Sequence, residues 1–478
     1  MNPDLLRRFD SKPNPIPTKV QNCNFDVAVD EELFQSATTN DEHSHLPLYK
    51  VLLSAQENTK VTKKIPGLQL CSYFWHNSRA FDMMKYLLLP TFLILFLFRP
   101  SQAQEAHISS TANADFRPAV VLAASGTNYL NRLALRGFSL DSQGVLIESL
   151  DGRTMYADLN SNVGFNPASV IKVATSFAAL SKLGPEYHFE TGFYADGTVN
   201  KKTRTLNGDL ILASAGDPVL TTIDVARLVH EVVRSGIARV TGNLIVTGPF
   251  SYGMFYTTDR ATKALSQMLR RAGVRVGGLT NGGPVRGASI ASHVSESLRD
   301  ILFYQNAHST NSIADRLGEA LGGARAVEEF LVKDVGIPQS DVYISHTSGL
   351  DFNRITPRAT VQLFRELVFW LNLSNLQPQD VLPVAGSDAG TLRRRFVGEE
   401  FRGAIIGKTG TLPGTDGGVS TLAGIAYTRN RGPVLFAIFN TMGSVATYRK
   451  LQDDFLKGFI LESGGIPETN ASLHRLNN

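Results

Sequence analysis

Cysteine is scarce in this chain of 478 residues, which has only Cys23 and Cys71. Both precede the most apolar segment, residues 86–98, and no cysteine follows that segment. A disulfide framework after residue 98 is therefore excluded. A chain of several hundred residues can bury a sufficient core without disulfides, so their absence is compatible with an exported protein.

The chain also lacks any concentration of charge of one sign. Its 47 basic and 43 acidic residues are scattered along the chain and give a formal net charge of +4. There is no basic block or arginine-rich helix, so we predict no nucleic-acid partner. With 43% hydrophobic and 19% charged residues, the composition is that of a globular protein, and its length allows more than one domain.

A long apolar run is missing as well. The most apolar segment, residues 86–98, has thirteen residues, and at about 1.5 Å per residue it spans roughly 20 Å, less than the roughly 30 Å of a bilayer core. It follows Met83-Met84-Lys85 and precedes Arg99-Pro100-Ser101-Gln102-Ala103, a pattern typical of a signal peptide. We predict a signal peptide at 83–103, cleaved after Ala103, and export to the periplasm or another extracytoplasmic compartment.

Residues 1–82 precede this signal and have no sustained helical or strand period. Because a signal peptide works at an N-terminus, we expect translation to start at Met83 or Met84 and residues 1–82 to be a non-native or disordered extension. The alternative is a cytosolic extension in front of an uncleaved anchor. With the signal removed, we expect no stable membrane span.

The 375 residues after the signal are enough for two domains. Two strand-like stretches flank Asp151-Gly152, a hairpin signal, and residues 187–246 are largely strand-like. We assign 104–186 and 286–478 to one domain and 187–285 to an inserted lobe. We expect helices at 169–183, 223–235, 311–321, 324–335, 357–371 and 446–461, and strands at 421–427 and 434–440.

Three short motifs occur in one order along the chain: Ser169-Val170-Ile171-Lys172, Ser309-Thr310-Asn311 and Lys408-Thr409-Gly410. Each alone is weak evidence, because such a serine is commonly a helix N-cap and Lys-Thr-Gly can be a strand that runs into a turn. Together they favour one chemistry, since their order, the helix start at Ser169 and the strand around Lys408 all agree with it.

That chemistry is nucleophilic catalysis by a serine with a lysine base. Residues three apart on a helix share a face, so the amine of Lys172 can reach the hydroxyl of Ser169. A lysine acts as a base only when its pKa is lowered, and we expect burial and the positive charge of Lys408 to lower it. From an extended connector, Ser309 would pass a proton to the leaving amine, and Asn311 would bind substrate amides or hold Lys172.

The third motif has the residue types that bind a peptide terminus. We expect Lys408 and Thr409 to recognise a terminal carboxylate, and Gly410 to leave room for a peptide along the strand. The backbone N–H groups of Ser169 and Thr411 would form an oxyanion hole. This chemistry requires no metal or organic cofactor.

These motifs resemble those of the penicillin-recognising acyl-serine enzymes. Within that group the chain is similar to the serine D-Ala-D-Ala carboxypeptidases of the penicillin-binding protein 4 type, peptidase family S13. The resemblance spans most of the chain after the signal. Further segments carry it: Gly216-Asp217-Pro218, Ser348-Gly349-Leu350, Leu382-Pro383-Val384-Ala385-Gly386 and Gly390-Thr391-Leu392.

The resemblance implies an α/β fold of the penicillin-binding, transpeptidase-like kind, in which an antiparallel sheet is flanked by helices and accompanied by a helical subdomain. It also implies an inserted, mainly β lobe between the first two motifs. The implied reaction is hydrolysis of the terminal D-alanine of peptidoglycan stem peptides, with β-lactams as covalent inhibitors. Some relatives are also endopeptidases that cut cross-links.

The sequence departs from this family in two respects. The spacing of 140 residues between Ser169 and Ser309 is shorter than in the longest members, which predicts that a subdomain is missing. His308 stands where many relatives have lysine, and His346 where aspartate is common. A loop histidine without a catalytic role explains His308 as well as a proton relay does, and a proline-stabilised turn explains Asp217 as well as a functional role does.

Other functions agree less well with the sequence. Gly407-Lys408-Thr409 lacks the first glycine of a phosphate-binding loop, because Arg402 stands there, and no Gly-x-Ser-x-Gly or His-Glu-x-x-His pattern occurs after the signal. A β-lactamase remains the enzymatic alternative, although no acidic loop of the class A kind is evident. A non-catalytic cell-wall binding protein is the second alternative, and the oligomeric state is left open.

Overall fold

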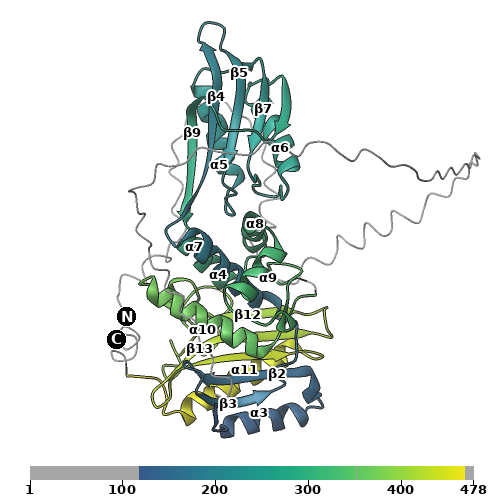
Figure 1. Ribbon diagram of the computed structural model, residues 1–478, viewed down its shortest axis with the longest axis vertical. Coiled ribbons are helices and arrows are strands. Elements are labelled where there is room, and N and C mark those ends of the chain that lie inside the picture. Colours follow the sequence, from purple (N-terminus) through teal and green to yellow (C-terminus); the bar gives the residue numbers. More distant parts are fainter. Residues whose placement is uncertain (1–117, 351, 469–478) are drawn as a thin grey trace, which may run out of the picture. The chain divides into compact units, whose positions relative to one another are not determined.

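The computed structural model describes residues 118–350 and 352–468, in which helices pack on two six-stranded β-sheets (Figure 1). The expected extension at 1–82 and signal peptide at 83–103 lie outside the described residues. Among the helices that the structure does describe, none is both long enough and apolar enough to cross a membrane.

The first sheet has the strand order β1-β3-β2-β14-β13-β12, and β12 lies at its edge. Its pairs are antiparallel except for β1 with β3. The expected hairpin joins β2 to β3 through Gly152, whose φ of 72° lies in the left-handed region that glycine adopts without strain. The strands are β1 (Ala119–Val120), β2 (Gln143–Ser149), β3 (Thr154–Leu159), β12 (Ile405–Leu412), β13 (Val419–Thr428) and β14 (Gly432–Asn440).

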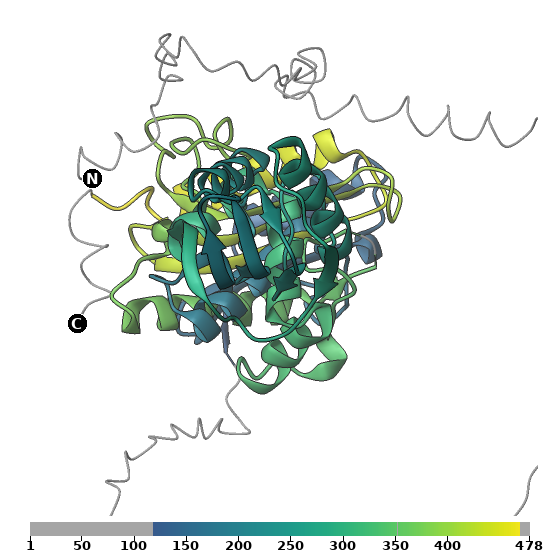
Figure 2. The ribbon, with the colours of Figure 1, turned by 90° about the horizontal axis from the view of Figure 1, so that it is seen from above.

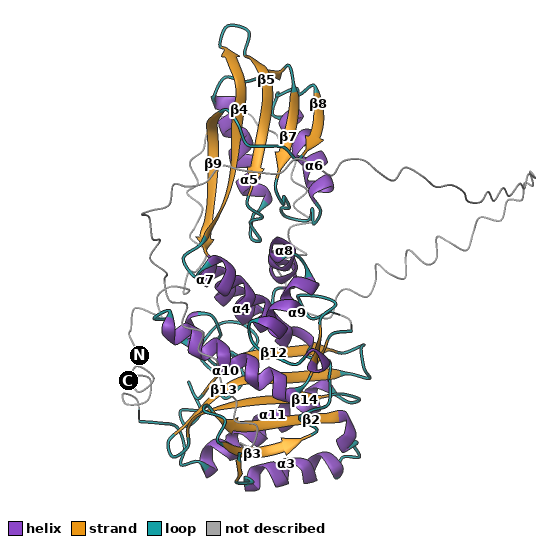
Figure 3. Ribbon diagram, in the orientation of Figure 1, coloured by secondary structure: helices purple, strands orange, loops and turns teal. Residues whose placement is uncertain are grey.

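Helices cover both faces of this sheet, so its central strands are apolar on both sides. Along β14, Leu435, Ala437 and Phe439 belong to the core on one face, and Phe436 and Ile438 to the core on the other. One face packs against α10 (Pro357–Leu373), and the other against α3 (Ala124–Ala134) and α11 (Val445–Glu462) (Figure 3).

A group of helices completes the hydrophobic core on the α10 side of the first sheet and carries two of the three motifs. Ala168–Ile171 forms a short 3-10 helix that continues into α4. The helices of this group are α4 (Lys172–Leu183), α7 (Leu298–His308), α8 (Asn311–Leu321) and α9 (Ala324–Lys333). A small ribbon of β10 (Val342–Tyr343) and β11 (Arg354–Ile355) lies in the chain between α9 and α10.

The second sheet, which we call the lobe sheet, has the order β8-β7-β5-β4-β9, with β6 paired to β5; Figure 2 shows the same ribbon from above. Two helices pack on it, and one of them, α5, begins with a capping box between Thr221 and Asp224. Its elements are β4 (His188–Asn200), β5 (Thr205–Ser214), α5 (Thr222–Arg234), β6 (Arg239–Val240), β7 (Asn243–Thr247), α6 (Thr258–Arg271), β8 (Gly278–Asn281) and β9 (Ala288–Ser297).

The structure moves one predicted domain boundary. We had placed residues from 286 onward in the first domain, but β9 pairs antiparallel with β4 and belongs to the lobe sheet. The lobe therefore ends near Ser297, where α7 begins with the Ser297 hydroxyl as its N-cap. The prediction missed this because β9 returns to its sheet through backbone pairing, which sequence patterns around residue 285 do not reveal.

Candidate active site

Ser169 lies in the tight turn that leads into α4. The preceding Ala168 has a φ of 46°, an uncommon conformation for a residue with a Cβ, and the Asn166 side chain accepts a hydrogen bond of 2.9 Å from its N–H. Gly349, with a φ of 92°, packs so closely that a Cβ there would lie 2.9 Å from the Ser169 nitrogen. Both neighbours hold the turn in one conformation, so the Ser169 hydroxyl has a fixed position.

The amine of Lys172 contacts the Ser169 hydroxyl. Its Nζ lies 2.8 Å from Ser169 Oγ and 2.6 Å from Asn311 Oδ1, and it also donates to the carbonyl of Ser348. The Lys172 side chain is fully buried. The structure thus brings together the Ser169 hydroxyl from the 3-10 helix, the buried amine of Lys172 from α4 and the amide oxygen of Asn311 from α8, and Ser348 adds a backbone carbonyl.

Burial lowers the pKa of Lys172 from 10.5 to about 7, and the nearby carboxylate of Asp315 opposes this change. The expected effect of burial on Lys172 is therefore confirmed, while the expected contribution of the Lys408 charge stays a prediction. Burial, and then repulsion from Lys172, hold the pKa of Lys408 well below its ordinary value. Near neutral pH, a large fraction of Lys172 is therefore a free base.

The second motif lies at a turn between two helices, and the predicted extended connector is wrong. Ser309 ends α7 in the left-handed conformation, with φ 58° and ψ 39°, and Asn311 is the first residue of α8. The left-handed residue ends one helix and lets the next begin two residues later. The Ser309 hydroxyl accordingly meets Lys408 Nζ at 2.8 Å, while Asn311 meets Lys172.

The third motif runs along the edge strand β12. Lys408 is fully buried, and its Nζ contacts Ser309 Oγ and the Thr409 carbonyl, each at 2.8 Å. The Thr409 hydroxyl donates to Thr391 Oγ1 at 2.8 Å. The two lysines therefore anchor one hydroxyl each, Lys172 that of Ser169 and Lys408 that of Ser309.

Gly410 lies where β12 passes close to the chain around Ser169. A Cβ at this position would lie 2.6 Å from the Pro167 carbonyl oxygen and 2.9 Å from Ala168 Cβ, so this side of the glycine is filled by the chain itself. The expected room for a peptide along the strand stays a prediction. Thr421 Oγ1 donates to the same Pro167 carbonyl at 2.8 Å. The glycine thus allows β12 to approach the 3-10 helix that carries Ser169.

The model of the D-Ala-D-Ala carboxypeptidase 3 (S13) family matches the chain over residues 132–250 and 247–455, a span that includes all three motifs. The chain belongs to this family. A curated relative, the D-alanyl-D-alanine carboxypeptidase DacB of Haemophilus influenzae, is 22% identical over 414 residues, covering 62% of this chain and 84% of the relative. The predicted family and the predicted D-Ala-D-Ala carboxypeptidase activity are confirmed.

Solved structures confirm the fold of this S13 carboxypeptidase. Penicillin-binding protein 4 of Haemophilus influenzae, complexed with a β-lactam, matches with a TM-score of 0.57 at 22% identity, covering 67% of this chain and 95% of that one. The penicillin G-acylated Bd3459 predatory endopeptidase of Bdellovibrio bacteriovorus matches with a TM-score of 0.53 at 22% identity, covering 69% and 94%. The predicted α/β penicillin-binding fold is therefore correct.

Several residues of the S13 site had no role in the sequence prediction. Asp315 Oδ1 accepts the Ser348 N–H at 3.1 Å, and it lies one helical turn after Asn311, a spacing that could have indicated it. Ser348 supplies a carbonyl to Lys172, and Thr391 a hydroxyl to Thr409. Both stood in segments that carried the family resemblance, but nothing local indicated which atom would reach the site.

The two histidines that depart from the family pattern, His308 and His346, lie beside site residues in the sequence. His308 is the last residue of α7 and stacks on Tyr304, with ring centroids 4.5 Å apart, and burial lowers its pKa. The backbone N–H of His346 donates to Asn353 Oδ1 at 3.1 Å. Within residues 118–350 and 352–468, no cluster of three or more His, Cys, Asp or Glu side chains could hold a metal ion.

Proposed function

We propose that this carboxypeptidase works through an acyl-enzyme on Ser169 and removes the terminal D-alanine of peptidoglycan stem peptides. The observation that carries the proposal is the 2.8 Å contact between Ser169 Oγ and the buried Lys172 amine, whose pKa is lowered to about 7. A nucleophile needs a base within hydrogen-bonding reach whose pKa lies near the working pH, and this pair meets both conditions.

Acylation begins when Ser169 Oγ attacks the carbonyl carbon of the penultimate D-alanine. Lys172 takes the hydroxyl proton as the new C–O bond forms. The C–N bond then breaks, and the proton held by Lys172 passes by way of the Ser309 hydroxyl, which lies 2.8 Å from Lys408 Nζ, to the leaving amine, so that Lys172 is neutral again. One proton thus leaves Ser169 and one arrives on the released D-alanine, so the step balances.

Substrate binding and charge stabilisation fall to the third motif. Lys408 and Thr409 would bind the terminal carboxylate of the substrate. The negative charge of that carboxylate would favour the charged form of Lys408 and raise its pKa, which is lowered in the free enzyme. The backbone N–H groups of Ser169 and Thr411 would stabilise the oxyanion. The close approach of β12 to Ala168 at Gly410 supports this pairing, because it brings the two segments together.

Deacylation needs water and returns the proton. A water molecule gives a proton to neutral Lys172 as it attacks the ester carbonyl, the C–O bond to Ser169 breaks, and Lys172 returns the proton to Oγ, which lies 2.8 Å away. A β-lactam would acylate the same serine, but its opened ring stays attached and does not leave as a free amine. Two relatives support β-lactam recognition: penicillin-binding protein 4, solved with a bound β-lactam, and Bd3459, solved as its penicillin G acyl form.

The proposal is tested by release of free D-alanine from a peptide that ends in D-Ala-D-Ala. The parent protein should release D-alanine continuously, and a Ser169→Ala variant with an unchanged melting temperature should release none. Release by the variant at the parent rate would refute the assignment of the nucleophile. Hydrolysis of nitrocefin distinguishes our proposal from the β-lactamase alternative. A β-lactamase would hydrolyse nitrocefin rapidly and continuously, whereas we expect slow reaction of one equivalent of nitrocefin per enzyme.

Endopeptidase cleavage of cross-links is the second candidate activity, because one structural relative is named an endopeptidase. A cross-linked muropeptide dimer tests it, since cleavage yields two monomers. A non-catalytic cell-wall binding protein is disfavoured, because its site would need neither a buried amine nor a hydroxyl in contact with it.

Export and domain organisation complete the proposal. We expect a mature N-terminus near Gln104 in an extracytoplasmic compartment, and intact-mass measurement of the native protein tests this. A native chain that retains Cys23 would contradict export by this signal. We further propose that residues 118–186, 298–350 and 352–468 form the catalytic domain, with the lobe sheet inserted between the first two of these segments.

A further inference from the structure

Helix α8 contacts the catalytic lysine on one side and the lobe on another. Asn311, Asp315 and Gly318 are spaced by four and three residues, so they share one face of the helix. This face meets Lys172 through Asn311 Oδ1 at 2.6 Å and the Ser348 N–H through Asp315 Oδ1 at 3.1 Å. A Cβ on Gly318 would lie 2.5 Å from Thr347 Cγ2, so this face packs directly against the 347–348 segment.

The adjacent residue Arg316 points to the lobe. Its guanidinium donates to the carbonyl of Gly253 at 2.6 Å and to that of Pro218 at 3.3 Å. It also lies over the ring of Tyr256, 5.2 Å from the centroid. Arg316 is only 9% exposed, although Tyr256 is 55% exposed, so the two hydrogen bonds of the guanidinium are largely shielded from water and stronger than surface ones.

The two carbonyls belong to loops that are themselves joined. The Gly253 N–H donates to the Leu220 carbonyl at 3.2 Å, which ties the 252–255 turn to the segment after Asp217. Gly253 has a φ of 50°, and a Cβ there would meet the Thr222 hydroxyl, so the turn requires glycine. One guanidinium therefore holds a pair of connected loops at the end of the lobe.

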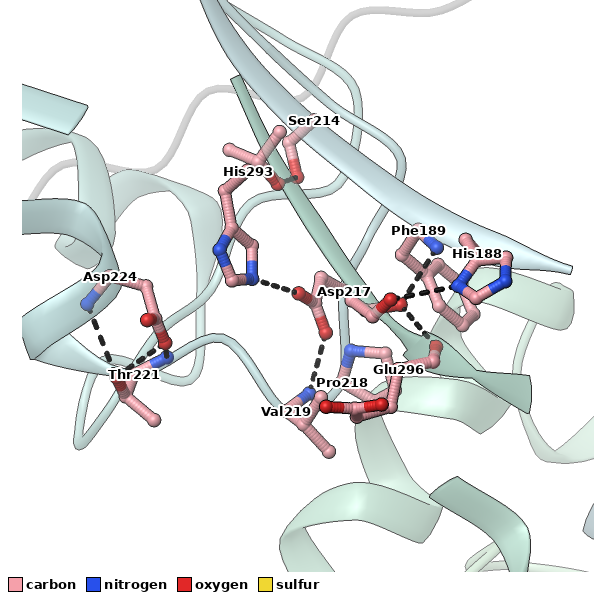
Figure 4. Close-up of polar contacts among 12 residues, drawn as sticks. His188, Phe189, Ser214, Asp217, Pro218, Val219, Thr221, Asp224, His293 and Glu296 are labelled. Carbon is pink, nitrogen blue, oxygen red and sulfur yellow. Dashed lines mark hydrogen bonds and ion pairs between the residues drawn. The ribbon is translucent and has the colours of Figure 1, made fainter. Parts of the chain in front are cut away.

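A buried carboxylate, that of Asp217, lies close enough to Arg316 to favour its charge. The Asp217 side chain is fully buried; it accepts the Val219 N–H at 2.9 Å and lies 3.4 Å from His293 Nε2 (Figure 4). Burial raises the pKa of Asp217, and burial lowers the pKa of Arg316, whose charge is favoured by Tyr256 and then Asp217. The opposite charges of Asp217 and Arg316 favour each other across the contact between α8 and the lobe.

We propose that Arg316 is a positioning residue for the carboxypeptidase reaction: it fixes α8 to the lobe loops, and α8 in turn holds Asn311 against Lys172. The proposal rests on the function assigned above to Lys172 and Asn311. It gives the lobe a role in catalysis although the lobe carbonyls that Arg316 binds belong to none of the three motifs. Arg316 acts through α8 and touches no reacting atom.

Loss of the contact between Arg316 and the lobe should change the pKa of Lys172 in a definite direction. Asn311 accepts a hydrogen bond that favours the charged amine, so a displaced α8 weakens that bond and lowers the pKa of Lys172 further. Asp315 on α8 and Lys408 on β12 also face Lys172, and both remain in the variant. The acidic limb of the acylation profile should therefore move to lower pH, while the plateau rate falls because the base is misplaced.

A double-mutant cycle tests the proposal in the full chain, with the rate of acylation by a fluorescent penicillin as the readout. Arg316→Gln should slow acylation roughly ten- to a hundredfold at the plateau, and Arg316→Lys, which keeps the charge and one donor group, should lose less. In an Asn311→Ala background, Arg316→Gln should cost little more, because both changes act on the same contact. Arg325→Gln is the matched control, since Arg325 is exposed on α9 and pairs only with Glu329 among the contacts described.

The outcomes separate the inference from the proposed function. Equal rate losses in both backgrounds, or a slower rate with an unmoved acidic limb, would overturn the positioning role. Undiminished acylation by Asn311→Ala alone would instead contradict the proposed site. If Arg316→Gln does not fold, as judged by circular dichroism, the same double-mutant cycle is measured with Arg316→Lys. The rate losses in the two backgrounds and the position of the acidic limb then test the positioning role in the same way.

Discussion

The pH dependence of acylation follows directly from the environment of Lys172. Burial lowers its pKa from 10.5 to about 7, which corresponds to roughly 5 kcal/mol against the charged form. At pH 7 about half of the Lys172 amines are then neutral, compared with about one in three thousand for an ordinary lysine. The protein thus raises the population of the free base by about a thousandfold.

The assay is the second-order rate constant for acylation by a fluorescent penicillin, measured from pH 5 to pH 9. The rate should rise about tenfold per pH unit below pH 7 and level off above it, because only the neutral amine accepts the Ser169 proton. Lys172→Arg keeps the charge but cannot lose a proton, so it should acylate at least about a thousandfold more slowly at pH 7. A limb near pH 10, or an arginine variant with the parent rate, would refute the reasoning.

Three further predictions concern the other motifs. Ser309→Ala should slow D-alanine release roughly a hundredfold or more by removing the proton relay, as measured by peptide turnover. Gly410→Ala should lower the free energy of unfolding by about 1–3 kcal/mol and slow acylation, because its Cβ would meet the chain beside Ser169, as measured by denaturant unfolding. Thr391→Val should raise KM for the peptide more than it lowers kcat, because Thr409 would lose the hydroxyl that orients it.

Each of these predictions has a result that would contradict it. Undiminished turnover by Ser309→Ala would place the relay elsewhere. Gly414→Ala is the control for the Gly410 variant, because a Cβ at Gly414 would meet nothing within 4 Å, so equal destabilisation by both would refute the steric argument. A Thr391→Val variant with unchanged KM and lower kcat would assign that hydroxyl to the reaction step instead of to binding.

Local sequence patterns predicted the helices of the catalytic domain well. The helix expected at 311–321 has these bounds, and those expected at 357–371 and 446–461 differ from α10 and α11 by two residues or fewer at each end. Such helices have strong local signals, for example Pro357 in the first turn after the Thr356 cap. The predicted end of the lobe was wrong because it depends on the pairing of β9 with β4, which is a long-range contact.

The site was predictable in its residues but less so in its geometry. The spacing of Ser169 and Lys172 on a helix was enough to indicate their contact, which the structure places at 2.8 Å. The left-handed conformation of Ser309 was not predictable, because serine rarely adopts it. The sequence analysis expected burial to lower the pKa of Lys172, but the extent of the burial, and so the pKa of about 7, required the structure.

The most direct test of the central claim is the intact mass of the purified protein after incubation with a penicillin, beside a Ser169→Ala variant. We predict one penicilloyl adduct on the parent and none on the variant. An adduct on both proteins would place the nucleophile elsewhere. No adduct on either would contradict an acyl-enzyme at this site.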